Sequence, residues 1–259
     1  MTRRRVVCMA LLAALAGAGL QAAPRPKAIG VVDYTSRYTW TKGARAAQAG
    51  LRTMIANLTA VGLQPETVSP DLFLRPNWPE RDRYRRLVVP VGAEYFSQAI
   101  HEGMEDYVRQ GGLLITSVSM ILQDKDADYV ITDQDGIADF ASEGVVGVHG
   151  QQTARMSRIK ALAACPLTQG LAPGEWVTLS QAVAGRRTRN LSAEVVILSD
   201  RELASGATGE QPFLTYRHLD RGACIYLVGQ LGTLDDPVLR QVFTNLVSPQ
   251  TLDWLCLQE

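Results

Sequence analysis

The sequence predicts an α/β fold with a doubly wound, mostly parallel sheet flanked by helices and with a late β-hairpin. The first observation is residues 87–119, where an apolar run, a helical stripe and a second apolar run follow one another. A crossover of this length makes the two strands parallel. The second observation is the alternation of strand and helix patterns from residue 28 onward. The third is a pair of apolar runs around residues 219–222, which predicts the hairpin.

The first predicted elements lie between residues 28 and 68. Residues 28–33 (AIGVVD) predict a core strand. Residues 41–62 carry apolar side chains at three- and four-residue spacing, which predicts the longest helix, ended by Gly62. Residues 66–68 predict a short second strand, and the prolines that follow predict a surface loop.

The central unit begins with residues 87–91, an apolar run suited to a strand buried on both faces. Residues 100–108 predict a helix with one apolar stripe. Gly111 and Gly112 close this helix, because glycine readily takes the left-handed conformation that a helix C-terminus often needs. Residues 113–116 predict the next buried strand.

The second half of the mature chain begins with an acidic surface excursion over residues 124–143. Residues 137–148 predict a short helix running into a strand, and residues 176–184 and 194–198 predict further strands. The hairpin pairs the runs on either side of residues 219–222, with Gly222 expected at positive φ.

The chain is expected to finish helically. Asp235 is predicted to cap a helix that has Pro237 in its first turn, and Pro249 opens a last short helix.

Composition and the N-terminus set the class of protein. Basic and acidic residues number 26 each, so no net charge favours nucleic acid as a partner. Residues 1–23 place three arginines before an apolar, alanine- and leucine-rich run, which predicts a secretory signal peptide and hence a periplasmic or secreted protein. Residues 24–259 then form a single domain, and no membrane span is expected once the signal is removed.

The expected exported chain keeps Cys165, Cys224 and Cys256. They allow at most one intramolecular disulfide, and the sequence does not choose among the three pairings. Cys224 lies within an apolar run, which favours a buried, inert thiol. The cysteines are scattered and the histidines lack ligand spacing, so no zinc site and no cofactor are expected.

Four segments spread over the chain carry a resemblance to a known fold. They are RRLVVPVG (85–92), EDYVRQGGLLITS (105–117), ACPLTQGL (164–171) and YRHLDRGACIYLVGQLG (216–232). With these segments the chain resembles the class I glutamine amidotransferase-like superfamily, which has a flavodoxin-like topology, and within it the non-catalytic branch. That branch includes the middle, trimerisation domain of family 42 β-galactosidases and the ThuA-like proteins. The resemblance implies a role in carbohydrate metabolism or, by analogy with the galactosidase domain, in homo-oligomer contacts.

The resemblance also implies where a nucleophile is missing. Active amidotransferases place a cysteine on a strained turn after the strand that is here 113–116, and pair it with a late His and Glu. This chain has Ser117, Val118 and Ser119 at that turn and lacks the late His-x-Glu pair. Glutamine hydrolysis is therefore not expected, and the resemblance implies a domain that binds a ligand or partner without catalysis.

A hydrolase is the alternative hypothesis. Ser117 would be its nucleophile with His149 or His218 as base, or a carboxylate such as Asp33 or Glu94 would act in the same crevice. A nucleophile elbow needs small residues two positions on either side of the serine, and only one side fits here. The simpler interpretation of Ser117 is a hydroxyl that caps the next helix.

Ligands of open parallel sheets bind beyond the carboxyl ends of the strands, so the polar and aromatic residues at those positions form the candidate binding set. Carboxylates and Arg can bind sugar hydroxyls while aromatic rings cover apolar ring surface, which favours a small-molecule or carbohydrate ligand. The alternative is that the aromatic side chains only pack under the loop before the long helix. The set is Asp33, Tyr34, Arg37, Tyr38, Trp40, Glu94, Tyr95, Ser117 and Ser119.

A calcium loop is a further hypothesis for the acidic excursion. Asp124, Asp126, Asp128 and Asp135 supply oxygen ligands at positions 1, 3, 5 and 12 of such a loop. Tyr129 replaces the glycine that the sharp turn requires, and Asp135 is shorter than the usual Glu. A solvated acidic loop is therefore the alternative.

Overall fold

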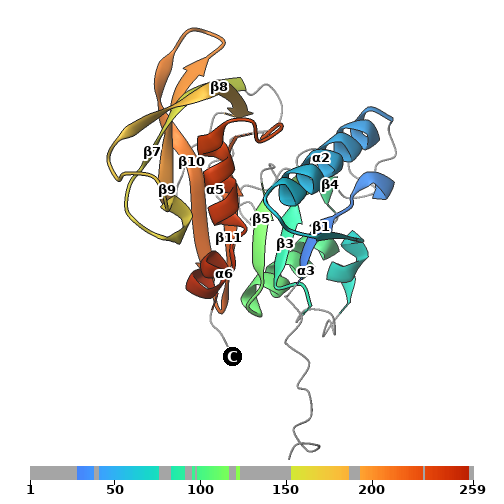
Figure 1. Cartoon of the computed structure of the whole chain (residues 1–259). Coiled ribbons are helices and arrows are strands. Elements are labelled where there is room, and N and C mark those ends of the chain that lie inside the picture. The colour runs from blue at the N-terminus through green and yellow to red at the C-terminus, as the bar shows by residue number, and fades with distance from the viewer. Residues whose placement is uncertain are drawn as a thin grey trace, which may run out of the picture.

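The computed structural model describes residues 28–37, 41–75, 83–90, 95–96, 98–116, 121–122, 153–186, 193–229 and 231–256. In these ranges the chain has an α/β fold with one nine-stranded sheet and a two-stranded sheet, β4 (Tyr95–Phe96) with β6 (Ile121–Leu122) (Figure 1). The strands of the large sheet are β1 (Ile29–Val32), β2 (Pro65–Val68), β3 (Arg86–Val89), β5 (Leu113–Thr116), β7 (Thr153–Ala161), β8 (Trp176–Arg186), β9 (Glu194–Leu203), β10 (Thr208–Leu219) and β11 (Gly222–Leu227). The helices are α2 (Thr41–Ala60), α3 (Gln98–Arg109), α5 (Pro237–Leu246) and α6 (Pro249–Leu255), with the 3-10 helices η1 (Thr35–Arg37), η2 (Pro70–Leu74) and η3 (Pro166–Thr168).

The large sheet is mixed, with strand order β2-β1-β3-β5-β11-β10-β9-β7-β8. The pairs from β2 to β11 are parallel and the pairs from β11 to β8 are antiparallel. The predicted parallel sheet is therefore confirmed for one half of the sheet only. The other half differs because β9, β10 and β11 are joined by tight turns, and such turns can connect only antiparallel neighbours.

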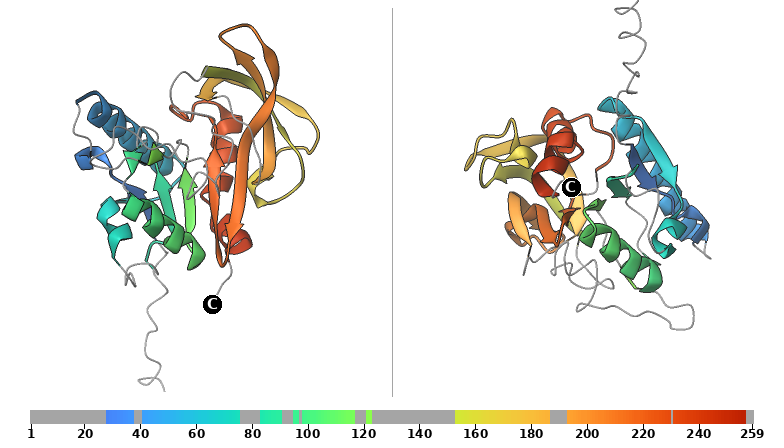
Figure 2. Two further views of the ribbon diagram at one scale, coloured as in Figure 1. Left: turned by 180° about the vertical axis from the view of Figure 1, so that it is seen from behind. Right: turned by 90° about the horizontal axis from the view of Figure 1, so that it is seen from below.

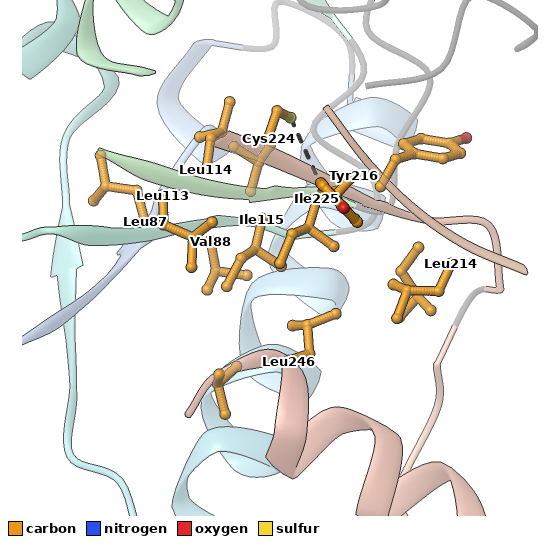
Figure 3. Close-up of a cluster of buried hydrophobic side chains, with 14 of the residues drawn as sticks. Leu87, Val88, Leu113, Leu114, Ile115, Leu214, Tyr216, Cys224, Ile225 and Leu246 are labelled. Atoms are coloured by element: carbon orange, nitrogen blue, oxygen red, sulfur yellow. Dashed lines mark hydrogen bonds between the residues drawn. The ribbon is translucent and has the colours of Figure 1, made fainter. Parts of the chain in front are cut away.

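Helices cover both faces of the sheet. Figures 1 and 2 show α2, α5 and α6 on one face and α3 on the other. The strands β3 and β5 are buried along their whole length, as the apolar runs predict. Side chains alternate between the two faces along β3, β5 and the neighbouring β11. Val88, Ile115 and Ile225 therefore point toward Leu246 of α5, while Leu114 and Cys224 point to the opposite face (Figure 3). The core thus has two layers, one on each side of the central strands.

The antiparallel half curls back on itself. Gly185 in β8 pairs with Gly229, just beyond β11, so the strands from β11 to β8 almost close into a small barrel. Buried Met156 and Phe213 lie against this junction, and a Cβ on Gly185 would come within 2.5 Å of the Met156 side chain. The close approach of the two backbones there accounts for a glycine on each side.

Two bulges shape this half-barrel. In the first, Met156 of β7 pairs with Val183 of β8 and Arg158 pairs with Thr178, so β8 has more residues than β7 between these two pairs. In the second, the register of the β7–β9 pairing shifts between Arg155 and Ile159. There the Asp200 carboxylate accepts hydrogen bonds from the backbone N–H of Ser157 (2.6 Å) and Arg158 (2.8 Å). The carboxylate thus satisfies donors that the bulge removes from the ladder.

Asp236 joins the β8 bulge to the start of α5. Its Oδ1 caps the helix by accepting from the N–H of Val238 (2.8 Å) and Leu239 (2.9 Å). Its Oδ2 accepts from the backbone N–H and the hydroxyl of Ser180 on the outer edge of β8. The predicted cap Asp235 is wrong by one residue, and Pro237 lies in the first turn of the helix as predicted. One buried carboxylate therefore both caps α5 and covers an edge donor of the sheet.

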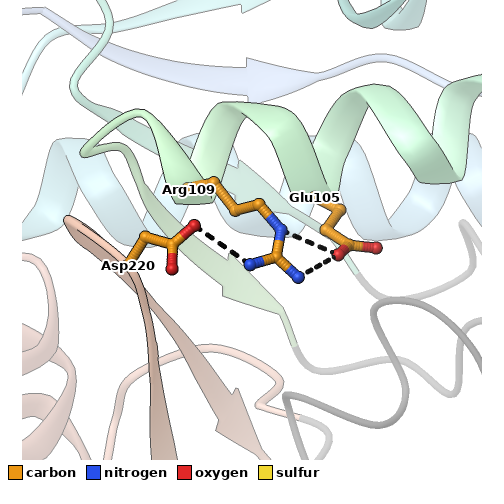
Figure 4. Close-up of polar contacts among 3 residues, drawn as sticks. All are labelled: Glu105, Arg109 and Asp220. Carbon is orange, nitrogen blue, oxygen red and sulfur yellow. Dashed lines mark hydrogen bonds and ion pairs between the residues drawn. The ribbon is translucent and has the colours of Figure 1, made fainter.

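The β10–β11 hairpin differs from its prediction at the turn. The positive φ falls on Asp220 (52°) and not on Gly222. Gly222 is required for another reason, because a Cβ there would lie 2.1 Å from the Val108 carbonyl oxygen of α3. Arg109 of α3 donates to Asp220 (3.0 Å) and to Glu105 (2.9 Å from Nε), which fastens the turn to α3 (Figure 4). The expected positive φ at Gly111 is present, at 101°.

The cysteines of the described part, Cys165, Cys224 and Cys256, are free thiols. Cys224 is fully buried, as predicted, and burial raises the pKa of its thiol well above its usual value. Burial also raises the pKa of Cys256, to about 11. Within the described ranges, no helix is long and apolar enough to cross a membrane.

Candidate functional site

The carboxyl ends of the parallel strands form the edge where a ligand is expected. The register aligns Val31 of β1 with Val88 of β3 and Val88 with Ile115 of β5. The three strands therefore end at one level, with β1 and β5 about 10 Å apart across β3. Asp33, after β1, and Thr116, at the end of β5, lie on this edge.

Asp33 is the carboxylate that the structure places there. It is partly buried, and its Oδ1 accepts from the Thr35 N–H (2.8 Å) and hydroxyl (2.6 Å), which starts η1. Its own N–H donates to the Val68 carbonyl oxygen (2.9 Å), which fixes the backbone beside β2. Among the described residues, Oδ2 has no hydrogen-bond partner. Asp33 is thus held in place by one oxygen and can offer the other to a hydroxyl.

Tyr34 lies in the hydrophobic core and is 1% exposed. It packs under the edge and is not available to a ligand at the surface. For Tyr34, the prediction that the aromatic side chains only pack under the loop before the long helix therefore holds. Arg37 is the last residue of η1.

Tyr95 belongs to the short strand β4, which is parallel to β6. Tyr95 is opposite Ile121 and Phe96 is opposite Leu122, so the segments that follow β3 and β5 come together beyond the edge of the large sheet. The remaining predicted residues lie outside the described residues: Tyr38, Trp40, Glu94, Ser117, Ser119 and the acidic Asp124, Asp126, Asp128 and Asp135.

His218 does not fit the role of a base at this edge. It pairs with Ala223, and Ala223 pairs with Leu113 at the start of β5. It is therefore at the opposite end of the strand from Thr116, about 10 Å away along the strand direction alone. Of the two candidate bases for Ser117, His149 lies outside the described residues.

Metal ligands do not gather in the part of the chain that the structure describes: no three His, Cys, Asp or Glu side chains there could hold an ion together. At the described edge, the Asp33 carboxylate is oriented so that it can accept a hydrogen bond from a ligand.

Comparison with known proteins identifies the fold. No family model and no curated protein matches the sequence. Among solved structures, a putative ThuA-like protein from Bacteroides uniformis matches with TM-score 0.54 and 14% identity, over 90% of this chain and 97% of that chain. A β-galactosidase from the haloarchaeon Halorubrum lacusprofundi matches with TM-score 0.52 and 12% identity, over 87% of this chain. A β-galactosidase from Bacillus circulans matches with TM-score 0.50 and 16% identity, over 85% of this chain.

The chain spans 30% of the length of these two β-galactosidase chains and nearly all of the ThuA-like protein. The likeness to both kinds of structure confirms, as a likeness of fold, the resemblance that the four sequence segments predict.

Proposed function

We propose that this chain is an exported, non-catalytic domain of amidotransferase-like fold that binds a carbohydrate-related ligand at the carboxyl edge of its parallel strands. The observation that carries the proposal is the end of β5 at Thr116. The next residues in the sequence are Ser117, Val118 and Ser119, where active amidotransferases of this fold carry their cysteine. A thiolate at that turn is what glutamine hydrolysis by that mechanism requires.

Three features support the ligand. The strand order of the parallel half, β2-β1-β3-β5-β11, is that of flavodoxin-like folds, whose ligands bind at the carboxyl edge. Asp33 presents one carboxylate oxygen there while the other is fixed by Thr35. Two of the three solved structures compared above are β-galactosidases, which makes a sugar the first class of ligand to test. Export is proposed from the signal-like pattern of residues 1–23.

The test is a thermal-shift screen of the purified protein against D-galactose, D-glucose, lactose and soluble polysaccharides. A sugar at about a hundredfold its Kd stabilises the folded state by about 2.7 kcal/mol, or roughly 5–10 °C for a chain of this size. Asp33→Asn keeps Oδ1 for Thr35 and changes only the free oxygen, so it should reduce the shift without unfolding the turn.

Asp235→Asn, at an exposed carboxylate of another loop, is the matched control and should leave the shift unchanged. Release of ammonia from glutamine by the purified protein, or the absence of a shift with every sugar, would contradict the proposal.

A further inference from the structure

A second polar and aromatic surface lies away from the carboxyl edge, where β10 ends and α6 crosses it. Tyr216 and His218 are two residues apart on β10 and face the same side of the sheet. The Tyr216 ring lies 5.4 Å from the His218 ring and 5.1 Å from the Trp254 ring of α6, both in edge-to-face geometry. Glu194 starts β9 opposite Tyr216. These four residues are called the aromatic cluster.

The rings of the aromatic cluster differ in exposure. Tyr216 is 6% exposed and is the buried member of the aromatic cluster, whereas Trp254 is 39% exposed. His218 and Glu194 are also exposed. Trp254 is one of three large hydrophobic side chains of the described part that remain this accessible. A large apolar ring is therefore kept at the surface beside two polar groups.

The exposed indole belongs to a firmly held helix. Ser248 caps α6 by accepting from the Thr251 N–H (3.1 Å), and Leu252 and Leu255 on either side of Trp254 are buried. Arg86 of β3 donates to the Val247 carbonyl oxygen just before the helix. The backbone that carries Trp254 is consequently held in place, and the indole packs against the Tyr216 ring, which lowers the entropy cost of binding.

The polar groups of the aromatic cluster are also oriented. The Tyr216 hydroxyl donates to Glu194 Oε2 at 2.6 Å, and burial together with this carboxylate raises the pKa of Tyr216 well above its usual value. The phenol thus stays a donor, and Glu194 Oε1 has no partner among the described residues. The His218 ring nitrogens likewise have none in the described part.

We propose that the aromatic cluster is a binding site for a neutral pyranose sugar. The apolar C–H face of the ring stacks on Trp254, and its hydroxyls bond to Glu194 and His218. The inference rests on the proposed function and adds a second place for the same class of ligand. Glu194 disfavours an anion, and no cationic side chain belongs to the aromatic cluster. An organic cation fits less well, because only one exposed indole face is available and the Glu194 charge is already shared with Tyr216.

The test is saturation-transfer NMR of the full chain with D-galactose, D-glucose and lactose. The wild type should transfer saturation to the ring C–H protons of at least one sugar. In an Asp33→Asn background, which weakens the site at the carboxyl edge, loss of the stacking surface in Trp254→Ala should weaken sugar binding about tenfold, and Glu194→Gln about fivefold. Trp176→Ala removes an indole that lies under Arg158 and Lys160 on another surface, and should change nothing.

Trp254→Phe keeps an aromatic ring, so it should bind sugar within about threefold of wild type, and circular dichroism of Trp254→Ala checks that this variant is folded. Unchanged binding in folded Trp254→Ala, with loss in Asp33→Asn, would overturn this inference and leave the proposed function standing. No sugar bound by the wild type would overturn both. Displacement of the bound sugar by millimolar tetramethylammonium would overturn the class of ligand.

Discussion

Loss of the Asp236 side chain should destabilise the protein strongly, because one carboxylate accepts hydrogen bonds from two elements, β8 and α5. Asp236 is 4% exposed, its Oδ1 caps α5, and its Oδ2 accepts two hydrogen bonds from Ser180. Loss of the cap costs about 1 kcal/mol, and loss of the two bonds to a charged acceptor costs about 2 kcal/mol. Asp236→Ala should therefore destabilise the protein by about 3 kcal/mol and lower its Tm by roughly 6–12 °C.

Asp236→Asn separates the two roles. The amide oxygen can still cap α5, but the amide nitrogen faces the Ser180 N–H, so only the second cost, about 2 kcal/mol, should remain. Asp235→Asn removes a neighbouring exposed carboxylate and should stay within about 0.5 kcal/mol of wild type. Urea unfolding followed by circular dichroism measures all three. Equal effects of Asp235→Asn and Asp236→Asn would refute the reasoning.

The pH dependence gives a second readout of Asp236. Burial favours protonation, but hydrogen bonds from Leu239, Ser180 and Val238 outweigh it and lower the pKa of Asp236. Because the folded pKa lies below the unfolded value of about 3.9, this stabilisation is complete above that pH and is lost as pH falls through the folded value. The Tm difference between wild type and Asp236→Asn should therefore shrink below about pH 4. A constant difference down to pH 2 would count against the assignment.

Three further predictions follow from the packing. Gly222→Ala forces a Cβ against the Val108 carbonyl oxygen, and should cost about 1–3 kcal/mol or more in urea unfolding; a neutral result would mean that α3 and β11 are not this close. Arg109→Ala removes ion pairs whose Arg side chain is 40% exposed, so it should lower the free energy of unfolding by under about 1 kcal/mol, and by less at 1 M salt. A larger loss of stability that does not depend on salt would contradict this. Of the three thiols of the described part, partly exposed Cys165 should react with a thiol reagent in the native protein, whereas Cys224 and Cys256 should react only after denaturation.

The parallel half of the fold could be predicted because its signals are local. Residues 113–116 are a strand with the predicted bounds, and α2 and β2 begin within a residue of the predicted positions. Short apolar runs, helical stripes and a glycine at a helix end each depend on a few neighbouring residues.

The antiparallel half could be predicted only in part. The strand β7 was missed because its apolar residues alternate at Ala154 and Met156 and then shift to Ile159, since the irregular pairing with β9 gives β7 an extra residue there and interrupts the two-residue period. The closure of Gly185 onto Gly229 joins residues far apart in the sequence, and no local pattern encodes it. The cap moved from Asp235 to Asp236 because Ser180, a distant residue, supplies half of its hydrogen bonds.

For the candidate site, the sequence located the edge but not the role of each side chain. Asp33 lies on the edge as expected, whereas adjacent Tyr34 points into the core. The aromatic cluster had no signal in the sequence, because Glu194, Tyr216 and Trp254 come from three elements that only the fold brings together.

Equilibrium dialysis against lactose tests most directly whether the protein binds a sugar without hydrolysing it. The sugar on both sides of the membrane is identified by chromatography. We expect an excess of lactose on the protein side, recovered intact after prolonged incubation. Free galactose and glucose in place of lactose, or equal lactose on both sides, would contradict a non-catalytic sugar-binding domain.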